Sequence, residues 1–191
     1  MQAIEAFLDY VSKMDKPRVL ELGTLRSKPE RSTMHKSFVP HATVFHGTDI
    51  CQGLDVDFIA DVHKLSSFVG EASYDVIISC STFEHFKYPH LAAHEISKVL
   101  RMQGCVFIQT HSCFPLHAYP YDYFRFSVEA LAGCFGTKNG IDVINTNYEF
   151  QCQILADAVG MKSTNWLNSN LFGIKNSKTP ATFVYELDAN L

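Results

Sequence analysis

The chain of 191 residues lacks several features that would assign it to a special class of protein. No run of about 18 apolar residues occurs, so we expect no membrane span. The N-terminus has no basic stretch followed by an apolar run and a cleavage site, which argues against a signal peptide. Basic residues are not in excess, because 16 Lys and Arg stand against 20 Asp and Glu, for a net charge of −4. We therefore do not expect a basic face for nucleic acid.

The cysteines form no CxxC pair and no spacing typical of zinc sites. Several lie in segments predicted to be buried strands. The six are Cys51, Cys80, Cys105, Cys113, Cys134 and Cys152. We interpret them as reduced core thiols of a cytoplasmic protein. At this length a single domain over residues 1–191 buries enough surface to fold without disulfides.

The stretch PRVLELGT, residues 17–24, organises the rest of the chain. Its apolar run after a proline is typical of a strand buried on both faces of a parallel sheet. Glu21 lies inside that run and Gly23 ends it. A carboxylate this close to the end of a buried strand needs a partner, because an unpaired buried charge is too costly to keep. In open α/β sheets ligands lie across the strand ends, so we predict a ligand site here.

Hydrophobic periodicity predicts the remaining elements. Helices are predicted over residues 2–14, near 31–38, and over 64–69, 89–101 and 127–135. Further strands are predicted over residues 43–47, 57–60, 74–80, 105–110, 141–148 and 170–174, with another over 182–187. Alternation of strands and helices predicts an α/β fold, a Rossmann-like, doubly wound, mostly parallel sheet in three layers, with the last two strands antiparallel at one edge. Residues 17–175 form its core.

Acidic residues end three successive predicted strands, namely Glu21, Asp49 and Asp61. Asp49 follows Gly23 by 26 residues, close to the spacing at which nucleoside-binding folds place a carboxylate on ribose hydroxyls. A carboxylate suits this task because it accepts hydrogen bonds from both hydroxyls of a diol. Each acid alone could instead cap a loop or a helix. Three acids in register favour a ligand.

The turn after the first strand reads GTLRSKPE and holds one glycine. A dinucleotide site would continue as GxGxxG, so that backbone amides approach a pyrophosphate. The single glycine therefore counts against NAD and nucleoside triphosphates. A ligand with ribose and adenine but no phosphate fits better.

Four segments carry a resemblance to a known family: VLELGT, GTDI, ADVHKL, and the run from YDVIISC through STFEH and RMQG to CVFIQTH. Over residues 17–135 the chain resembles the class I S-adenosylmethionine-dependent methyltransferases, particularly their small bacterial-type members. The resemblance implies S-adenosylmethionine as cofactor and methyl transfer as activity. It implies cofactor contacts by Glu21, Gly23 and Thr24 at the methionine end, Asp49 at the ribose, Ile50, Asp61 and Val62 at the adenine, and Ser79, Cys80 and Ser81 beside the transferred methyl group.

Two histidines at the ends of predicted strands are candidate catalytic bases, His85 in STFEH and His111 after FIQT. A pKa near neutrality suits histidine for taking a proton from a hydroxyl group. Either ring could instead be structural, His111 as a hydrogen-bonded core residue and His85 at the start of a helix. The loop HSCFPLHAYPYDYFRFS mixes donors, acceptors and flat rings, as small-molecule pockets do. Its candidate substrate contacts are His117, Tyr119, Asp122, Tyr123 and Arg125.

The same loop also has structural readings. Asp122 and Arg125 could form a plain salt bridge, and the aromatic residues could belong to the core. His111, Cys113 and His117 do not have a recognised metal-ligand spacing, so no metal is expected.

We predict a transferase that moves a methyl group from S-adenosylmethionine to a small polar acceptor, with an oxygen of a sugar or natural product favoured. Its partner is the small-molecule substrate, without nucleic acid or membrane, and a homodimer is compatible with the sequence. The alternative is a catalytically degenerate methyltransferase fold that acts as a partner or regulatory subunit. A short-chain dehydrogenase would need a tyrosine with lysine four residues later, which no tyrosine here has. A nucleic-acid methyltransferase is disfavoured by the acidic balance and by the lack of an added recognition domain.

Overall fold

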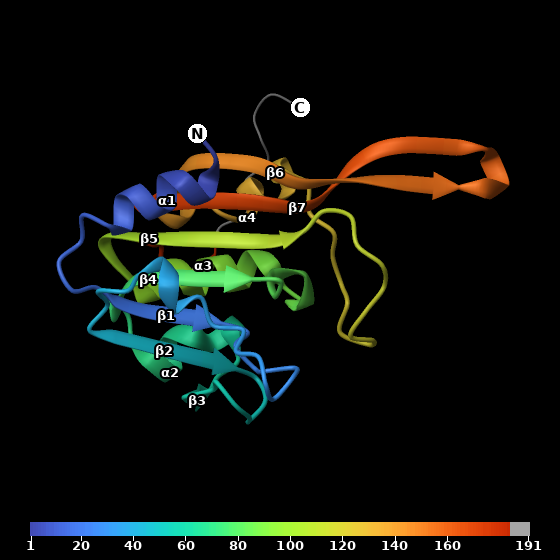
Figure 1. Cartoon of the computed structure of the whole chain (residues 1–191). Helices are drawn as coiled ribbons and strands as arrows, with labels where there is room; N and C mark the ends of the chain where they lie inside the picture. The colour runs from blue at the N-terminus through green and yellow to red at the C-terminus, as the bar shows by residue number, and fades with distance from the viewer. Residues whose placement is uncertain (184–191) are drawn as a thin grey trace.

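The computed structural model describes residues 1–183, and their strands form one seven-stranded sheet of order β3-β2-β1-β4-β5-β7-β6 (Figure 1). β1 to β5 are parallel, β7 is antiparallel to β5, and β6 is antiparallel to β7. The bounds are β1 Arg18–Leu22, β2 Val44–Asp49, β3 Phe58–Ile59, β4 Tyr74–Cys80, β5 Leu100–His111, β6 Ile141–Ala156 and β7 Met161–Lys175. The predicted Rossmann-like sheet with an antiparallel edge is confirmed.

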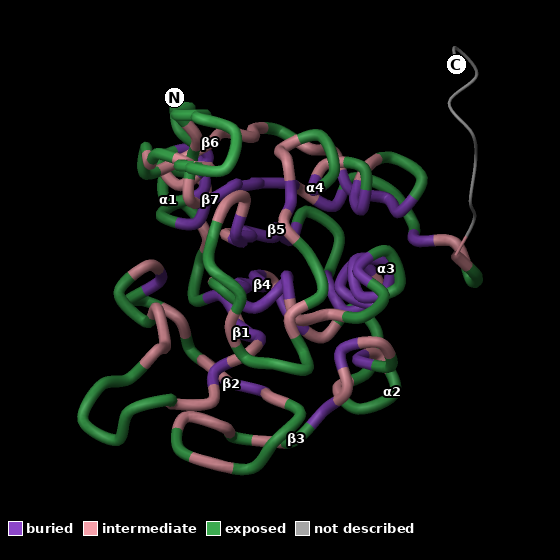
Figure 2. The backbone as a smooth tube through the Cα atoms, turned by 90° about the vertical axis from the view of Figure 1, so that its right-hand side faces the viewer, coloured by how far each residue is buried: buried purple, intermediate pink, exposed green. Residues whose placement is uncertain are grey.

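Helices cover both faces of the sheet, as Figure 2 shows with the strands seen nearly end-on. α2, α3 and α4 lie on one face, and α1 with the segment after β1 lies on the other. The bounds are α1 Ala3–Val11, α2 Leu65–Val69, α3 Pro89–Val99 and α4 Val128–Cys134, with short 3-10 turns η1 Lys36–Phe38, η2 Val62–Lys64, η3 Phe83–His85, η4 Thr137–Asn139 and η5 Asp157–Val159. The three predicted layers are therefore present.

Each face of the sheet has its own apolar cluster. Under α1, the ring of Phe7 stacks on that of Phe107, with 5.1 Å between the ring centroids, and Phe172 packs edge-on against Phe7. The other face buries Leu20 and Ile77 among the residues of α2, α3 and α4. The consecutive apolar residues of β1 and β4 are explained by this burial on both sides.

Four predicted elements are wrong in part. The helix predicted near residues 31–38 is only the single turn η1, because this polar, proline-broken segment offers no apolar stripe to bury. The strand predicted over 105–110 begins earlier, at Leu100, and Gln103 within it has a positive φ of 63°. The predicted helices over 2–14 and 89–101 end earlier, at Val11 and Val99.

The last two strands are much longer than predicted. Beyond the sheet they continue as a two-stranded arm, paired from Gln151 with Trp166 out to Ala156 with Met161 (Figure 1). The arm was missed because polar and apolar side chains alternate there without a buried face. The strand predicted over 182–187 is not found at Thr182 and Phe183, and its other residues lie outside the described part of the chain.

All six cysteines are free thiols, but the prediction of core thiols is wrong in part, because only Cys105 and Cys134 are buried and Cys51 is exposed. Among residues 1–183, no helix combines the length and the apolar character that a membrane crossing requires.

Candidate active site

On the sheet face that α1 covers, side chains change from apolar to polar toward the carboxyl ends of the strands. Alternate residues of a strand share a face, so Phe107 under α1 is followed on β5 by Gln109. The strand register places Gln109 beside Cys80 of β4 and Asn170 of β7. Glu149 of β6 joins them, because its Oε2 accepts hydrogen bonds from Gln109 Nε2 and Asn170 Nδ2 at 2.9 Å each. We call Glu21, Cys80, Gln109, Asn170 and Glu149 the polar row.

The polar row is negatively charged. Burial raises the pKa of the Cys80 thiol, and the carboxylates of Glu21, Glu149 and Glu84 raise this pKa further. Three acidic side chains from separate elements therefore act on one thiol at the end of β4. Such a surface favours a cationic ligand.

The carboxylate of Glu21 already has a partner within the chain. His35 donates its backbone N–H to Glu21 Oε2 at 2.8 Å, and His35 Nδ1 lies 2.6 Å from Glu21 Oε1. The need of this buried charge for a partner is thus met by the segment after β1. The sequence argument that a ligand must meet that need is wrong, although Glu21 stays at the predicted edge.

The turn after β1 is tightly packed. Gly23 has a φ of 74°, and a Cβ atom there would lie 2.1 Å from Cγ2 of Thr82, so only glycine fits. The amides of Gly23 and Thr24 both donate to the Thr48 carbonyl, at 2.8 and 3.2 Å. The Thr24 hydroxyl donates to the Asp55 carbonyl at 2.6 Å. The polar groups of this turn are therefore engaged by the protein itself.

Asp49 ends β2 at the same edge of the sheet. Its Oδ1 accepts from the Cys51 amide at 3.0 Å, and its Oδ2 accepts from the Leu25 amide at 3.3 Å. Each carboxylate oxygen has two lone pairs, so one acceptor position on each stays available. Ile50 follows with its side chain exposed, at 68%.

Asp61 and Val62, the predicted adenine contacts, follow β3. Asp61 caps η2 by accepting from the His63 amide at 3.0 Å, and its Oδ1 lies 2.7 Å from His63 Nδ1. Val62 is buried in the apolar cluster on the α3 side. The structure thus assigns both residues a structural contact, while their predicted contact with adenine stays a prediction.

The end of β4 holds the three residues predicted to border the methyl group. Ser79 is fully buried, and its Oγ has no hydrogen-bond partner in residues 1–183. Cys80 belongs to the polar row. Ser81 leaves the strand with a positive φ of 49°, and its amide donates to the Gln109 carbonyl at 2.9 Å.

A fully buried carboxylate, that of Glu84 in η3, lies among the histidines predicted to be catalytic. Its Oε2 accepts from the Thr110 hydroxyl at 2.7 Å. Its Oε1 lies 3.0 Å from His111 Nε2 and 3.8 Å from His85 Nε2. Burial lowers the pKa of His111 below its usual range, opposed by the Glu84 charge. The structure therefore brings both predicted bases together around one carboxylate, which we call the Glu84 cluster.

The loop of residues 112–126 adds His117 to the Glu84 cluster, with 3.9 Å between His117 Nε2 and Glu84 Oε1. Asp122 holds this histidine by accepting from its amide at 2.9 Å. Arg125 in turn donates to both Asp122 oxygens, at 2.6 and 2.8 Å. The salt bridge between Asp122 and Arg125, which the sequence left open as a structural alternative, is thus present in the loop.

The two tyrosines predicted to contact the substrate lie differently. Tyr119 is 95% exposed, so it makes little contact with the rest of the chain. Tyr123 is nearer the Glu84 cluster, because its amide donates to the Glu84 carbonyl at 3.1 Å.

Sequence reasoning missed Gln109 and Asn170 of the polar row. It also missed Glu84, and with it His35, Glu149 and Asn168. Glu84 was available from the sequence, since it follows the end of the fourth strand by four residues and stands beside a histidine. The other three come from a loop and from the antiparallel hairpin, and no local pattern marks them.

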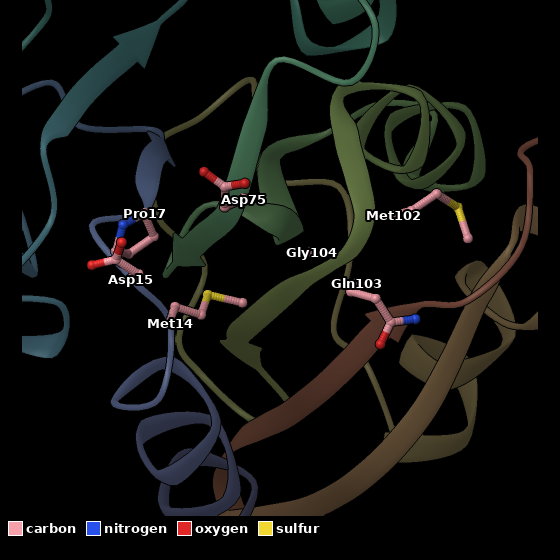
Figure 3. A pocket seen from close by; sticks show the side chains of 7 residues that line it. All are labelled: Met14, Asp15, Pro17, Asp75, Met102, Gln103 and Gly104. Carbon is pink, nitrogen blue, oxygen red and sulfur yellow. The ribbon is translucent and has the colours of Figure 1, made fainter.

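A hollow of the surface lies at the opposite, amino-terminal ends of the strands, where Pro17, Asp75 and Gly104 meet (Figure 3). Two acidic residues line it, Asp15 and Asp75, and the Asp75 carboxylate is already bonded, because it accepts from the Arg18 amide at 2.8 Å and from Arg101 at 3.1 Å. We therefore place the active site at the carboxyl ends.

Comparison with known proteins identifies the type of fold. Residues 40–108 match the family model of a methyltransferase domain. No curated protein sequence matches the chain significantly.

Solved structures share the fold. One is the YcgJ protein from Bacillus subtilis, with a TM-score of 0.63 and 14% identity over 92% of this chain and 98% of that one. An S-adenosylmethionine-dependent methyltransferase from Mesorhizobium loti has a TM-score of 0.62 and 13% identity, over 90% of this chain and 95% of that one. The 1,6-didemethyltoxoflavin N1-methyltransferase of Burkholderia thailandensis was solved with S-adenosylhomocysteine. Its TM-score is 0.61 and its identity 15%, over 92% of this chain and 77% of that one.

A segment of the chain thus matches a methyltransferase domain, and the fold is that of solved S-adenosylmethionine-dependent methyltransferases. S-adenosylmethionine is the cofactor of this class, and the residues present suit it. The acids around Cys80 match a sulfonium cation, and the free acceptor positions of Asp49 match a ribose diol. Ser79 Oγ and Asn170 Oδ1 are buried, and nothing in the described chain hydrogen-bonds to them. A methyltransferase domain with these groups at its strand ends has the donors and acceptors that such a ligand requires.

Proposed function

We propose that this methyltransferase methylates an oxygen atom of a small polar acceptor, such as a sugar or a natural product. The observation that carries the proposal is the position of the Glu84 cluster beside the polar row. His111 ends β5 two residues after Gln109, so imidazole groups border the acidic surface that suits the cofactor. A proton acceptor is needed beside the methyl donor when the acceptor atom is a hydroxyl oxygen.

The bound cofactor supplies a methyl group that its sulfonium already activates. The chain's own task is to bind, orient and deprotonate. Asp49 is our candidate for the ribose hydroxyls and Glu21 for the edge nearest the methionine end. Ser79, Cys80 and Ser81 lie beside them at the end of β4.

His111 is our first candidate base. Its Nδ1 lies 3.2 Å from Asn168 Oδ1, which fixes the orientation of the ring. His85, held by its Nδ1 at 2.7 Å from the Tyr121 carbonyl, is the second candidate. The acceptor would enter beside the loop of residues 112–126, whose His117 already reaches Glu84.

The fold does not fix the acceptor atom, since the Burkholderia enzyme is named for a nitrogen acceptor. Our preference for oxygen rests on the histidines. The test is transfer of labelled methyl from S-adenosylmethionine to a panel of sugars, phenols and amines. We expect label in hydroxyl acceptors. Label in amines alone would refute the oxygen assignment.

A second candidate function is a partner or regulatory subunit without activity. The closed turn after β1 favours it, because the Gly23 and Thr24 amides and the Glu21 carboxylate are already bonded within the chain. Calorimetry with S-adenosylhomocysteine separates the two. Binding supports the enzyme, and absence of binding supports the partner. The free thiols agree with action in the cytoplasm, as we propose.

A further inference from the structure

We propose that Glu84, His85 and His117 bind one divalent transition-metal ion, of the zinc type, beside the acceptor site. The role of this ion rests on the proposed function, whereas its binding does not. The three ligand atoms, one from each residue, lie within 4.8 Å of one another. This assignment revises the sequence expectation of no metal, which considered His111, Cys113 and His117 instead.

The first step of the argument is the Glu84 carboxylate. Its side chain is 0% exposed, so water does not solvate its charge. One oxygen accepts from Thr110, but Oε1 receives no hydrogen bond from any described residue. His111 Nε2 lies 3.0 Å from Oε1 as an ion-pair contact, without a hydrogen bond between them. A buried carboxylate oxygen without a donor is costly unless a cation meets it.

The second step concerns which ring nitrogens carry hydrogen. His85 Nδ1 lies 2.7 Å from the Tyr121 carbonyl oxygen, and His117 Nδ1 lies 3.2 Å from the Pro115 carbonyl oxygen. A carbonyl only accepts, so both Nδ1 atoms must donate. In the neutral ring Nε2 then presents a lone pair. Metal-binding histidines have this arrangement, with the second ring nitrogen held by a carbonyl or carboxylate.

The third step is the spacing of the lone pairs. His85 Nε2 and His117 Nε2 lie 3.8 and 3.9 Å from Glu84 Oε1. A hydrogen bond would require about 2.7–3.2 Å. Two ligand atoms on one tetrahedral Zn²⁺ lie roughly 3.4 Å apart, given bonds of about 2.0–2.1 Å. The observed distances are therefore closer to those of a shared cation than to those of a shared proton.

The fourth step is how the loop is held in place. Glu84 and His85 belong to η3, while His117 comes from the loop after β5. The carbonyl of Glu84 accepts from the amides of Tyr123 and Phe124, at 3.1 Å each. Arg125 binds Asp122 and also donates to the Pro115 carbonyl at 2.9 Å. The two amide bonds attach the loop to η3 and the Arg125 bonds hold the loop in its own shape, so the ligands lie together before any ion arrives.

The ligand set indicates the class of ion. Two imidazoles and one carboxylate suit zinc and its neighbours, rather than magnesium or calcium, which prefer oxygen. Three protein ligands leave a fourth position open. We assign that position to an oxygen of the methyl acceptor, which the ion would orient. His85 is then a ligand, and His111 remains the candidate base.

The experiment uses the full chain, treated with EDTA and dialysed. Co²⁺ is added while the visible absorption of tetrahedral cobalt is followed, and Zn²⁺ binding is measured by calorimetry. We expect one equivalent of either ion. His117→Ala should weaken binding at least about tenfold, and His117→Gln should do the same with less disturbance of the loop. His90→Ala removes an exposed histidine of α3 and should bind like the wild type.

Calorimetry with S-adenosylhomocysteine on the same samples separates the two proposals. Cofactor binding without any metal binding would overturn the metal site alone. Metal binding without cofactor binding would overturn the proposed function alone. If both His117 variants stay folded by circular dichroism and bind Zn²⁺ as tightly as the wild type, the ligand assignment is refuted.

Discussion

Removal of the Asp49 carboxylate tests the assignment of the ribose. Each of its two oxygens accepts one hydrogen bond from a backbone amide, that of Cys51 at 3.0 Å and that of Leu25 at 3.3 Å. One acceptor position on each oxygen is left for the two hydroxyls of a ribose. A hydrogen bond to a charged group contributes about 1.5–3 kcal/mol, so two of them are worth about 3 kcal/mol or more. Asp49→Ala should therefore weaken cofactor binding at least about 100-fold.

Asp49→Asn refines this prediction. The amide oxygen still accepts from Cys51, and the amide nitrogen can still meet one hydroxyl, so we expect a loss of about tenfold. The assay is calorimetry with S-adenosylhomocysteine. The matched control is Asp9→Ala, which removes an exposed carboxylate of α1 paired with Lys13. An unchanged Kd for Asp49→Ala, in a protein as stable as the control, would show that another group binds the ribose.

Three further predictions concern the scaffold. Phe7→Ala should lower the free energy of unfolding by about 3–5 kcal/mol in urea titrations, because Phe7 is fully buried and stacks on Phe107; a loss below about 1 kcal/mol would mean that α1 packs elsewhere. Burial lowers the pKa of His94 in the folded chain, so the unfolded chain takes up the proton first, and stability should fall as pH drops through the usual histidine range. Comparison of His94→Leu with the wild type between pH 7.5 and 5.5 checks this, and an equally steep decline in both would count against it. Arg125→Ala removes the hydrogen bonds to Asp122 and to the Phe114 and Pro115 carbonyls that hold the loop of residues 112–126 in its own shape, so limited proteolysis should cut that loop faster, while cleavage at the wild-type rate would contradict this role.

The hydrophobic pattern of neighbouring residues was sufficient to predict the strands at the centre of the sheet. β4 has the bounds that its β-branched run predicts, and the Ser127 side chain caps α4 by accepting from the Ala130 amide at 3.1 Å. These features depend on neighbouring residues. The carboxylates at the ends of β1 and β2 also lie at the predicted edge, because parallel strands bring their carboxyl ends together.

The remaining parts depend on contacts between distant segments. Nothing near Glu21 in the sequence predicts that His35 binds it across 14 residues. The Glu84 cluster likewise requires a loop about 30 residues further along to fold back onto η3. The hairpin arm has no buried face, so the order of polar and apolar residues along it did not predict a strand. Tertiary contacts, rather than local periodicity, decide these features.

The most direct measurement of the central claim is a crystal structure grown with S-adenosylhomocysteine. The account predicts ligand density across the carboxyl ends of β1, β2 and β4, with the ribose at Asp49 and the sulfur near Cys80. Density in the hollow between Pro17 and Gly104, or on the outer face of the arm, would contradict it.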